Sequence, residues 1–383
     1  MKICYINPTQ VLRRPLVELA GLMSKKGHKV TLIYPKDILR KSEQFHYDKL
    51  LDGVNLIPIK TFDLPFIRNP LPNPITLFKE IKKALEENDI VHYWEYYYFN
   101  SIAPVILKKF GRYKAKIIFT TDGFVGYTYK PKILSTVFRI YTKIFRNFLF
   151  YTPDKITFYS NNLINDAKEI GLPIRNSVVI PTGINLKKFR NIKSNTRKEF
   201  DIKKDEILIT CIGMLTNRKR PWIFINSIKE LKEKYNIRAL LIGHGPLEKE
   251  CKRLCKGIKE ITIIGNRKDV PEILSTSDIV FMPGIGEGLP GVVMEAAASA
   301  KPVIASNEGG TSDILIHNKT GFLSNNEEEF KRYLEILIKD KKLRNKMGKE
   351  ALRRIKKFDW NVVLKKYEVL YNNLLRGKDG NPN

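Results

Sequence analysis

The sequence predicts an α/β protein with two doubly wound parallel-sheet domains that face each other across a cleft. Short apolar runs alternate with helix-length amphipathic segments in both halves of the chain, and this pattern is typical of parallel sheets covered by helices on both faces. The alternation lapses once, in the polar and basic residues 185–205, which we interpret as the connection between the domains. A chain of 383 residues is long enough for two hydrophobic cores. We therefore expect one domain over residues 1–185 and a second over residues 186–360.

In the first half, both types of element follow from hydrophobic periodicity. Strands are expected at residues 2–6, 29–34, 89–93, 115–120, 155–159 and 177–180. Helices are expected at residues 13–26, 75–86, 101–110, 133–150 and 161–170.

The second half repeats the alternation and ends in a charged helical tail. Strands are expected at residues 206–213, 238–242, 260–264, 278–282 and 302–305. Helices are expected at residues 222–235, 247–256, 292–300, 327–339 and 341–357. A last helix, 361–376, is expected to pack back on the first domain.

The net charge of +28 is high and predicts an anionic partner: a nucleic acid, a membrane surface or a phosphorylated ligand. Residues 1–7 lack the pattern of a signal peptide, and no apolar run approaches the ~18 residues that a membrane span requires. We therefore expect a cytoplasmic protein, peripheral at most, on the inner face of the cell membrane. Cys251 and Cys255 lie one helical turn apart, but no second pair or histidine cluster accompanies them, so no metal site is expected.

Residues 279–306 form the stretch in which the chemistry is expected. An apolar run is followed by a glycine-rich loop, a helix rich in alanine and a second apolar run, with Pro290 at the first position of the helix. The loop contains Gly284, Gly286, Gly288 and Gly291. Such a loop lies at the carboxyl edge of a parallel sheet, and its N–H groups at the positive end of the helix dipole suit a phosphate. The glycine spacing matches neither a dinucleotide-binding fingerprint nor a P-loop.

Two carboxylates accompany this loop. Glu287 lies within the loop and Glu295 lies one turn into the helix. A carboxylate competes with a bound anion unless it faces another part of the ligand, so sugar hydroxyls on either side of a diphosphate would explain the pair. The alternative is that Glu287 is a solvated loop residue and Glu295 only favours the helix N-terminus.

Ordered motifs in the second half resemble the family 4 glycosyltransferases. They extend over about 110 residues and comprise Gly213-Met214-Leu215 with Lys219, Ile242-Gly243-His244-Gly245-Pro246-Leu247, Asp278 to Pro283, Glu287-Gly288 with Pro290, Glu295-Ala296, Lys301 to Ala305, Gly309-Gly310 and Gly321-Phe322-Leu323. The resemblance implies the GT-B fold, with two Rossmann-like domains, and transfer of a sugar from a nucleotide-diphosphate donor with retention of anomeric configuration. It also implies that no metal is required and that no cofactor is bound, since the UDP- or GDP-linked sugar is a substrate.

The resemblance implies roles for individual residues. Glu287 would face the donor sugar, Glu295 would hold the ribose hydroxyls, and Lys219 would neutralise the leaving diphosphate. The rest of the donor site would be formed by Gly243 and by the segment Gly288, Leu289, Pro290 and Gly291. Outside this context, a basic run such as 218–220 is more often a solvated turn.

Two departures from the family pattern affect the expected site. Met214 stands where the family usually has an arginine that contacts the diphosphate, and we expect Arg218 to supply that charge. Asp122 stands where the family often has a histidine in the catalytic cleft. Its carboxylate could bind a hydroxyl of the donor sugar or stabilise positive charge at the anomeric carbon; the alternative is an aspartate that braces its loop.

The acceptor side is predicted from a basic region of the first domain. The segment from residue 108 to residue 155 contains eleven lysines and arginines but only two aspartates. The amphipathic segment 133–150 carries Arg139, Lys143 and Arg146 beside a phenylalanine-rich face, as in helices that lie in a bilayer interface. Trp94 and Tyr97 could stack on a sugar or lie at a membrane surface. We infer a lipid-linked or glycolipid acceptor and an anionic membrane surface; the alternative is a core helix with a solvated basic edge.

Competing interpretations remain at this point. Another GT-B enzyme, such as a transferase to a soluble acceptor or a sugar-nucleotide epimerase, is the nearest. The charge alone would also permit nucleic-acid binding, but ordered glycine loops with paired glutamates have no place in that function. No nucleic-acid partner is therefore expected.

Overall fold

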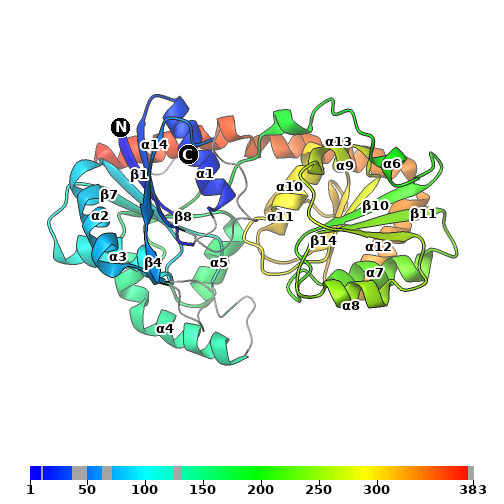
Figure 1. The fold of residues 1–383 in the computed structure, drawn as a ribbon, viewed down its shortest axis with the longest axis horizontal. Helices are drawn as coiled ribbons and strands as arrows, with labels where there is room; N and C mark the ends of the chain where they lie inside the picture. Colours follow the sequence, from blue (N-terminus) through cyan, green and yellow to red (C-terminus); the bar gives the residue numbers. More distant parts are fainter. Residues whose placement is uncertain (10–11, 37–49, 63–70, 125–126, 128–131, 378–383) are drawn as a thin grey trace. The chain divides into compact units, whose positions relative to one another are not determined.

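The computed structural model describes residues 1–9, 12–36, 50–62, 71–124, 127 and 132–377. The chain forms two compact units, Met1–Gly183 with Asn361–Asn383, and Ile184–Trp360. Each unit contains a parallel sheet with helices on both of its faces (Figure 1). None of the helices within these residues is long and apolar enough to span a bilayer.

Unit 1 contains a seven-stranded sheet in the order β3-β2-β1-β6-β7-β8-β9. Its strands are β1 (Lys2–Ile6), β2 (Lys29–Pro35), β3 (Val54–Ile59), β6 (Ile90–Trp94), β7 (Lys116–Thr121), β8 (Lys155–Phe158) and β9 (Ser177–Val179). Its helices are α1 (Arg14–Lys25), α2 (Pro74–Glu87), α3 (Phe99–Phe110), α4 (Lys132–Tyr151) and α5 (Asn161–Glu169), and β4 (Thr61–Phe62) pairs with β5 (Leu71–Pro72). The edge strand β3 and the β4–β5 pair were not predicted.

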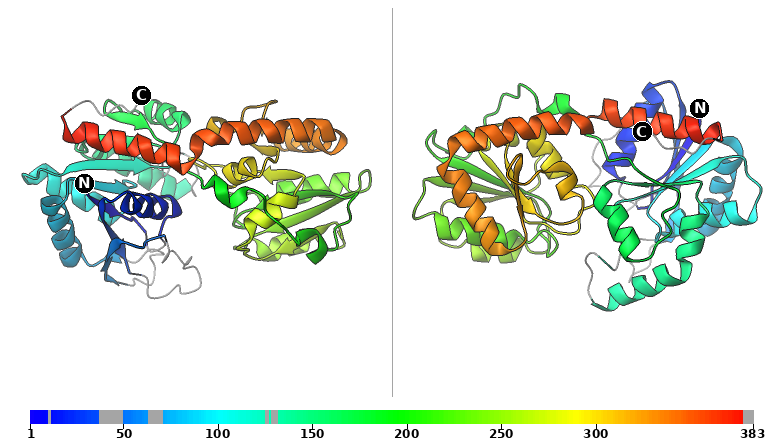
Figure 2. Two further views of the ribbon diagram at one scale, coloured as in Figure 1. Left: turned by 90° about the horizontal axis from the view of Figure 1, so that it is seen from above. Right: turned by 180° about the vertical axis from the view of Figure 1, so that it is seen from behind.

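Helix α14 (Trp360–Leu375) returns to the sheet of unit 1 (Figure 2). The hydroxyl of its Tyr371 lies 2.7 Å from His92 Nδ1 and 3.3 Å from the hydroxyl of Tyr5, both on central strands. The other ring nitrogen of His92 lies 2.6 Å from Thr120 Oγ1. Burial lowers the pKa of His92 well below its usual value, so the imidazole is neutral and exchanges one hydrogen bond with each neighbour.

Unit 2 contains a six-stranded sheet in the order β12-β11-β10-β13-β14-β15. Its strands are β10 (Ile207–Ile212), β11 (Ile237–Ile242), β12 (Ile261–Ile264), β13 (Ile279–Met282), β14 (Val303–Ser306) and β15 (Gly321–Ser324). Its helices are α6 (Thr196–Glu199), α7 (Pro221–Leu231), α8 (Glu248–Leu254), α9 (Val270–Thr276), α10 (Gly291–Ala298), α11 (Thr311–Ile314), α12 (Glu327–Lys339) and α13 (Lys341–Ile355), with 3-10 turns at Leu186–Phe189 and Lys356–Phe358. Strand β15 and the short helices α6, α9 and α11 were not predicted.

The stretch 185–205, which we interpreted as a connection, belongs to unit 2. Leu186 and Phe189 are buried, and Arg197 Nη2 lies 2.7 Å from Asp278 Oδ2 at the start of β13. The stretch is polar in sequence because it covers the surface of unit 2 and buries only a few apolar side chains.

The register of the central strands brings three loops to one edge of the second sheet. Strand β13 lies between β10 and β14, with Thr210 beside Val280 and Met282 beside Ala305. Because all three strands run in the same direction, the loops 213–220, 283–290 and 307–310 leave the sheet side by side. This edge holds the residues that the sequence singled out.

Candidate active site

Three charged side chains meet at the carboxyl edge of the second sheet. Arg218 Nη1 donates to Glu287 Oε1 at 2.8 Å, and Lys219 Nζ donates to the same oxygen. The side chains of Glu287 and Lys219 are 16% and 17% exposed, and that of Arg218 is 40% exposed. The structure thus brings together Lys219, Glu287 and the arginine that we expected to replace the charge missing at Met214.

The two loops that carry these side chains are joined through their main chains. The N–H group of Ile285 donates to the carbonyl of Arg218 at 3.0 Å, and Arg218 Nη1 also donates to the carbonyl of Gly286 at 3.3 Å. The loop that follows β14 holds Glu287 from the other side, since the N–H group of Gly310 donates to the Glu287 carbonyl at 3.0 Å. A Cβ atom on Gly309, whose φ is 57°, would lie 2.1 Å from that carbonyl oxygen. Only glycine therefore permits this approach.

Arg220 braces the turn that presents the two cations. Its φ of 47° is left-handed, which is uncommon outside glycine. Its Nε donates to the carbonyl of Pro283 at 2.8 Å, and its Nη2 donates to Ser306 Oγ at 2.8 Å. Sequence pattern alone does not separate Arg220 from its basic neighbours, because both of its partners lie more than sixty positions away.

Helix α10 directs its N-terminus toward the same edge. It begins at Gly291, with Pro290 as the N-cap residue, so the expectation that Pro290 is the first helical residue is wrong by one position. The first N–H groups of a helix have no acceptor within it, so those of Gly291 and the residues after it suit an anion. Gly288 and Glu295 are half-buried, whereas Leu289 is only 9% exposed and packs with the core.

Gly243 follows the neighbouring strand β11 and allows two loops to come close together. Its φ is 145°, and a Cβ atom there would lie 1.9 Å from the carbonyl oxygen of Gly213. A small hollow beside this contact is lined by residues that include Met214, Lys219 and Gly284. Met214, which stands where the family usually has an arginine, is 61% exposed.

A second cluster lies at the carboxyl edge of the first sheet. Arg13 Nη1 lies 2.5 Å from Glu95 Oε1 and 3.1 Å from Asp122 Oδ2, and Thr121 Oγ1 donates to Glu95 Oε2 at 2.9 Å. Glu95 is fully buried and has a left-handed φ of 61°. Burial and the nearby Asp122 carboxylate raise the pKa of Glu95 well above its usual value, against the opposing effect of Arg13.

Of this cluster the sequence indicated only Asp122, and Glu95 is its most deeply buried charged member. The available signal was its position directly after the fully buried strand β6, where strand-end residues in parallel sheets often carry function. Asp122 keeps a half-exposed carboxylate at this edge, so it is placed where a ligand of unit 1 can reach it.

The expectation for Trp94 is wrong, and the surroundings of Tyr97 are now defined. Trp94 is 1% exposed, stacks on His92 with centroids 4.1 Å apart and donates from Nε1 to the hydroxyl of Tyr159 at 2.7 Å. An indole that is packed in this way has no face left for a sugar or a membrane. The Tyr97 ring is half-buried against Tyr98 and Phe138.

Helix α4 presents apolar and basic side chains together. Val137, Ile140 and Ile144 are 56%, 54% and 65% exposed, at positions that share one face of the helix. A row of basic side chains lies next to this face on the same helix: Arg139, Lys143 and Arg146. These three side chains line a shallow hollow together with Tyr127 and Ile170. Arg139 lies over the Tyr127 ring at 5.2 Å, and Arg146 Nη1 donates to the carbonyl of Gly171 at 3.1 Å.

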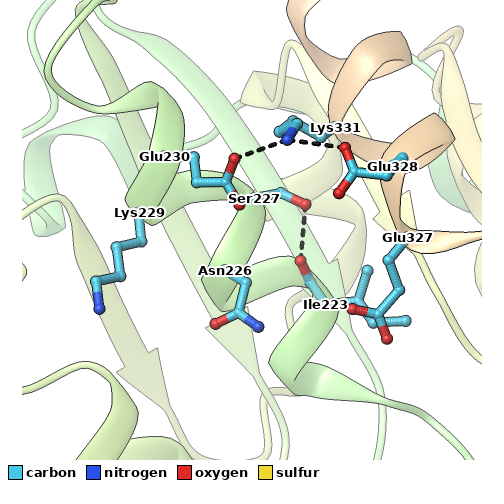
Figure 3. Close-up of a pocket in the computed structure, with 8 residues that line it drawn as sticks. All are labelled: Ile223, Asn226, Ser227, Lys229, Glu230, Glu327, Glu328 and Lys331. Atoms are coloured by element: carbon cyan, nitrogen blue, oxygen red, sulfur yellow. Dashed lines mark hydrogen bonds and ion pairs between the residues drawn. The ribbon is translucent and has the colours of Figure 1, made fainter.

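A separate hollow in unit 2, between α7 and α12, is not part of this site (Figure 3). Lys331 extends across it and pairs with Glu230 at 2.8 Å and with Glu328 at 2.9 Å, while Ser227 Oγ donates to the carbonyl of Ile223 (Figure 3). These charges satisfy one another, and the lining contains none of the residues at the carboxyl edge.

The chain is similar to known protein families over most of its length. The profile of the family "Glycosyl transferases group 1" matches residues 192–354, and that of "Glycosyltransferase Family 4" matches residues 14–188. The chain is 28% identical over 334 residues, 80% of this chain and 81% of the relative, to the UDP-Gal:alpha-D-GlcNAc-diphosphoundecaprenol alpha-1,3-galactosyltransferase of Escherichia coli. It is 26% identical over 281 residues, 67% of this chain and 69% of the relative, to a GDP-mannose-dependent alpha-(1-6)-phosphatidylinositol monomannoside mannosyltransferase of Mycobacterium tuberculosis.

The fold agrees with that of solved structures as well. The crystal structure of Anabaena HepE in complex with UDP superposes with a TM-score of 0.79 at 15% identity, over 96% of this chain and 98% of that one. The two family profiles lie end to end and between them account for most of the chain. This protein is therefore a glycosyltransferase with the GT-B fold and belongs to glycosyltransferase family 4.

Proposed function

We propose that this glycosyltransferase moves a hexose from a nucleotide-diphosphate donor to a lipid-linked or glycolipid acceptor, with retention of anomeric configuration and without a metal. The observation that carries the proposal is the pair of cations, Arg218 and Lys219, on one oxygen of Glu287 at the sheet edge toward which α10 directs its N-terminus. Cations and helix N–H groups at one edge suit a diphosphate, and the carboxylates suit hydroxyls on either side of it.

The donor occupies unit 2 in this proposal. Its diphosphate lies against Lys219, Arg218 and the first N–H groups of α10, and the ribose hydroxyls bind Glu295. When the bond to the sugar breaks, negative charge grows on the leaving diphosphate, and fixed cations that are partly shielded from water stabilise that charge without reorganisation. Arg218 and Lys219 supply this charge, so a metal ion is not needed.

Substitution on the face that the diphosphate leaves gives retention. An oxygen of the leaving diphosphate takes the proton of the acceptor hydroxyl, so no separate base is required. Glu287 holds the donor sugar by its hydroxyls. Asp122 of unit 1 would stabilise the positive charge that develops at the anomeric carbon, and Arg13 Nη1 pairs with this carboxylate at 3.1 Å.

The acceptor side of the proposal rests on α4. Exposed Ile140 and Ile144 beside Arg139 and Lys143 form a surface that suits the interface of an anionic bilayer. The E. coli and M. tuberculosis relatives are named for acceptors on diphosphoundecaprenol and phosphatidylinositol, which are lipids. We infer that this enzyme works as a peripheral protein at the inner face of the cell membrane.

The membrane surface can be tested by charge reversal on α4. Arg139→Glu with Lys143→Glu should weaken binding to phosphatidylglycerol vesicles, measured by co-sedimentation, by about 30-fold or more, since each basic residue near an anionic surface contributes about 1 kcal/mol. Lys342→Glu with Lys346→Glu, on exposed positions of α13, changes the net charge equally and should leave binding near that of the parent. Equal loss in both double variants would mean that only net charge matters and that α4 is not the contact surface.

The function itself is tested with labelled donors. The protein is incubated with UDP-sugars and with GDP-mannose in the presence of a membrane lipid extract, and the label is followed into the lipid phase. Lys219→Ala should lower transfer by about 100-fold or more, the usual effect of removing a group that stabilises transition-state charge. Label found only in water-soluble product would identify a soluble-acceptor transferase, and a changed sugar without transfer would identify an epimerase.

A further inference from the structure

One oxygen atom of Glu287 accepts hydrogen bonds from both cations of the proposed donor site. Oε1 accepts from Arg218 Nη1 at 2.8 Å and from Lys219 Nζ. An ionised carboxylate between two cations, in a region partly shielded from water, is a strong interaction for all three groups. The donor diphosphate proposed above would need the same two cations.

The backbone around Glu287 is fixed, while its side chain is the part that can change partners. Its carbonyl accepts from the N–H group of Gly310 at 3.0 Å, and Gly309 packs against the same carbonyl so closely that a Cβ atom would be only 2.1 Å away. Rotation about the side-chain bonds of Glu287 can therefore release the cations without moving the loop.

Contacts other than the Glu287 carboxylate hold the turn that carries the two cations. Arg218 Nη1 also donates to the carbonyl of Gly286 at 3.3 Å, and the carbonyl of Arg218 accepts from Ile285 at 3.0 Å. The turn before Lys219 is closed by an N–H bond from Lys219 to the carbonyl of Thr216 at 3.0 Å. None of these contacts involves the Glu287 carboxylate, so the turn that carries Arg218 and Lys219 is held independently of it.

We propose that the Glu287 carboxylate stands in for the donor diphosphate on Arg218 and Lys219, and that the arriving diphosphate displaces it toward the sugar hydroxyls. The inference rests on the proposed function and adds a selectivity to it. A nucleotide sugar displaces the carboxylate and gives it new hydrogen-bond donors. A nucleoside diphosphate displaces it and gives it none, while its own charge repels the carboxylate. Glu287 thus weakens binding of the product and favours the donor.

The isosteric variant Glu287→Gln tests this directly. Calorimetry first identifies whether the parent protein binds UDP or GDP. The variant should bind that nucleotide about tenfold more tightly, because one negative charge beside the diphosphate is gone. The preference for the corresponding UDP-sugar or GDP-mannose over the free nucleotide should shrink. Glu287→Ala should change nucleoside diphosphate binding in the same direction, which guards against an effect peculiar to glutamine.

Glu295→Gln is the matched control, since it removes the same charge from α10. It should weaken the nucleotide and the nucleotide sugar by one common factor, because the ribose belongs to both. Unchanged or weaker nucleoside diphosphate binding in both Glu287 variants would overturn the stand-in role while leaving the proposed donor site intact. A parent protein that binds neither UDP nor GDP would refute the proposed function, and the inference with it.

Discussion

The close approach of Gly309 to Glu287 offers a severe test of how the site is built. In Gly309→Ala the new methyl group would lie 2.1 Å from the Glu287 carbonyl oxygen, whereas ordinary contacts begin at 3.4 Å. The difference, 3.4 − 2.1, requires a displacement of about 1.3 Å. The displacement would move Glu287, whose carboxylate pairs with both cations, and would disturb the hydrogen bond from the Gly310 N–H group to the Glu287 carbonyl.

Gly257 provides a control that separates backbone strain from this clash. Its φ is 79°, and a Cβ atom there would meet nothing within 4 Å. Alanine in a left-handed conformation costs about 1–2 kcal/mol, and the reduced freedom of the unfolded chain offsets about 0.4–1 kcal/mol of that. Gly309→Ala carries the same terms and, in addition, about 1–3 kcal/mol for overpacking. We therefore expect Gly309→Ala to be the less stable variant by about 1–3 kcal/mol.

Urea denaturation of the two variants and the parent measures the stability difference, and the labelled-donor assay measures transfer. A misplacement of about 1 Å in a catalytic group can cost about 100-fold in rate, so transfer should fall by that order in Gly309→Ala and remain near the parent value in Gly257→Ala. If both variants lose the same stability and Gly309→Ala keeps normal transfer, the contact with Glu287 does not organise the site.

Two further predictions concern unit 1. Burial and the Asp122 carboxylate raise the pKa of Glu95 in the folded protein above its value of 4.5 in the unfolded chain. The folded protein therefore keeps a proton on Glu95 at pH values where the unfolded chain has released it. The stability that this proton contributes is complete below pH 4.5 and is lost as the pH rises through the folded pKa. Glu95→Gln should therefore flatten the decline of the unfolding midpoint above pH 4.5, and an unchanged slope would contradict the assignment. Tyr371→Phe leaves a ring nitrogen of buried His92 without its 2.7 Å partner, so urea denaturation should show a loss of about 1–3 kcal/mol, and a change near zero would show that this hydroxyl does not hold α14.

The chemistry-bearing loop was predictable because its signals are local. Strand β13, the glycines after it and helix α10 follow one another within some twenty residues, so periodicity and composition define all three. Strand β3 escaped prediction because it lies at the edge of the sheet, where only Ile59 is fully buried and the apolar pattern is weak. Strand β15 begins at Gly321, a residue that usually interrupts a strand.

The partners of the site residues could not be predicted, because they depend on register between distant strands. Arg13 and Glu95 are 82 positions apart, and Lys219 and Glu287 are 68 apart. Sequence motifs indicated that cations and a carboxylate belong to one site, but not that a single oxygen would hold both cations. Trp94 was also misplaced because its surroundings depend on the sheet order. The aromatic run that contains it suggested a sugar-binding or membrane surface, whereas β6 lies in the middle of the sheet and buries the indole.

In the proposed donor site, the main-chain bonds between the loops would let Arg218 supply the charge that the family's usual arginine supplies at position 214. The hydrogen bond from Ile285 to Arg218 and the contacts of Gly310 with Glu287 fix the loops by backbone, whatever side chains they carry. A positive charge is then useful wherever the turn after β10 brings a side chain within reach of the glycine loop, and Arg218 reaches it at 2.8 Å. A diphosphate would require a positive charge at this place on the sheet edge, whichever sequence position supplies it. For the proposed donor site, comparison of aligned residues alone would therefore miss the charge that Arg218 brings to the sheet edge.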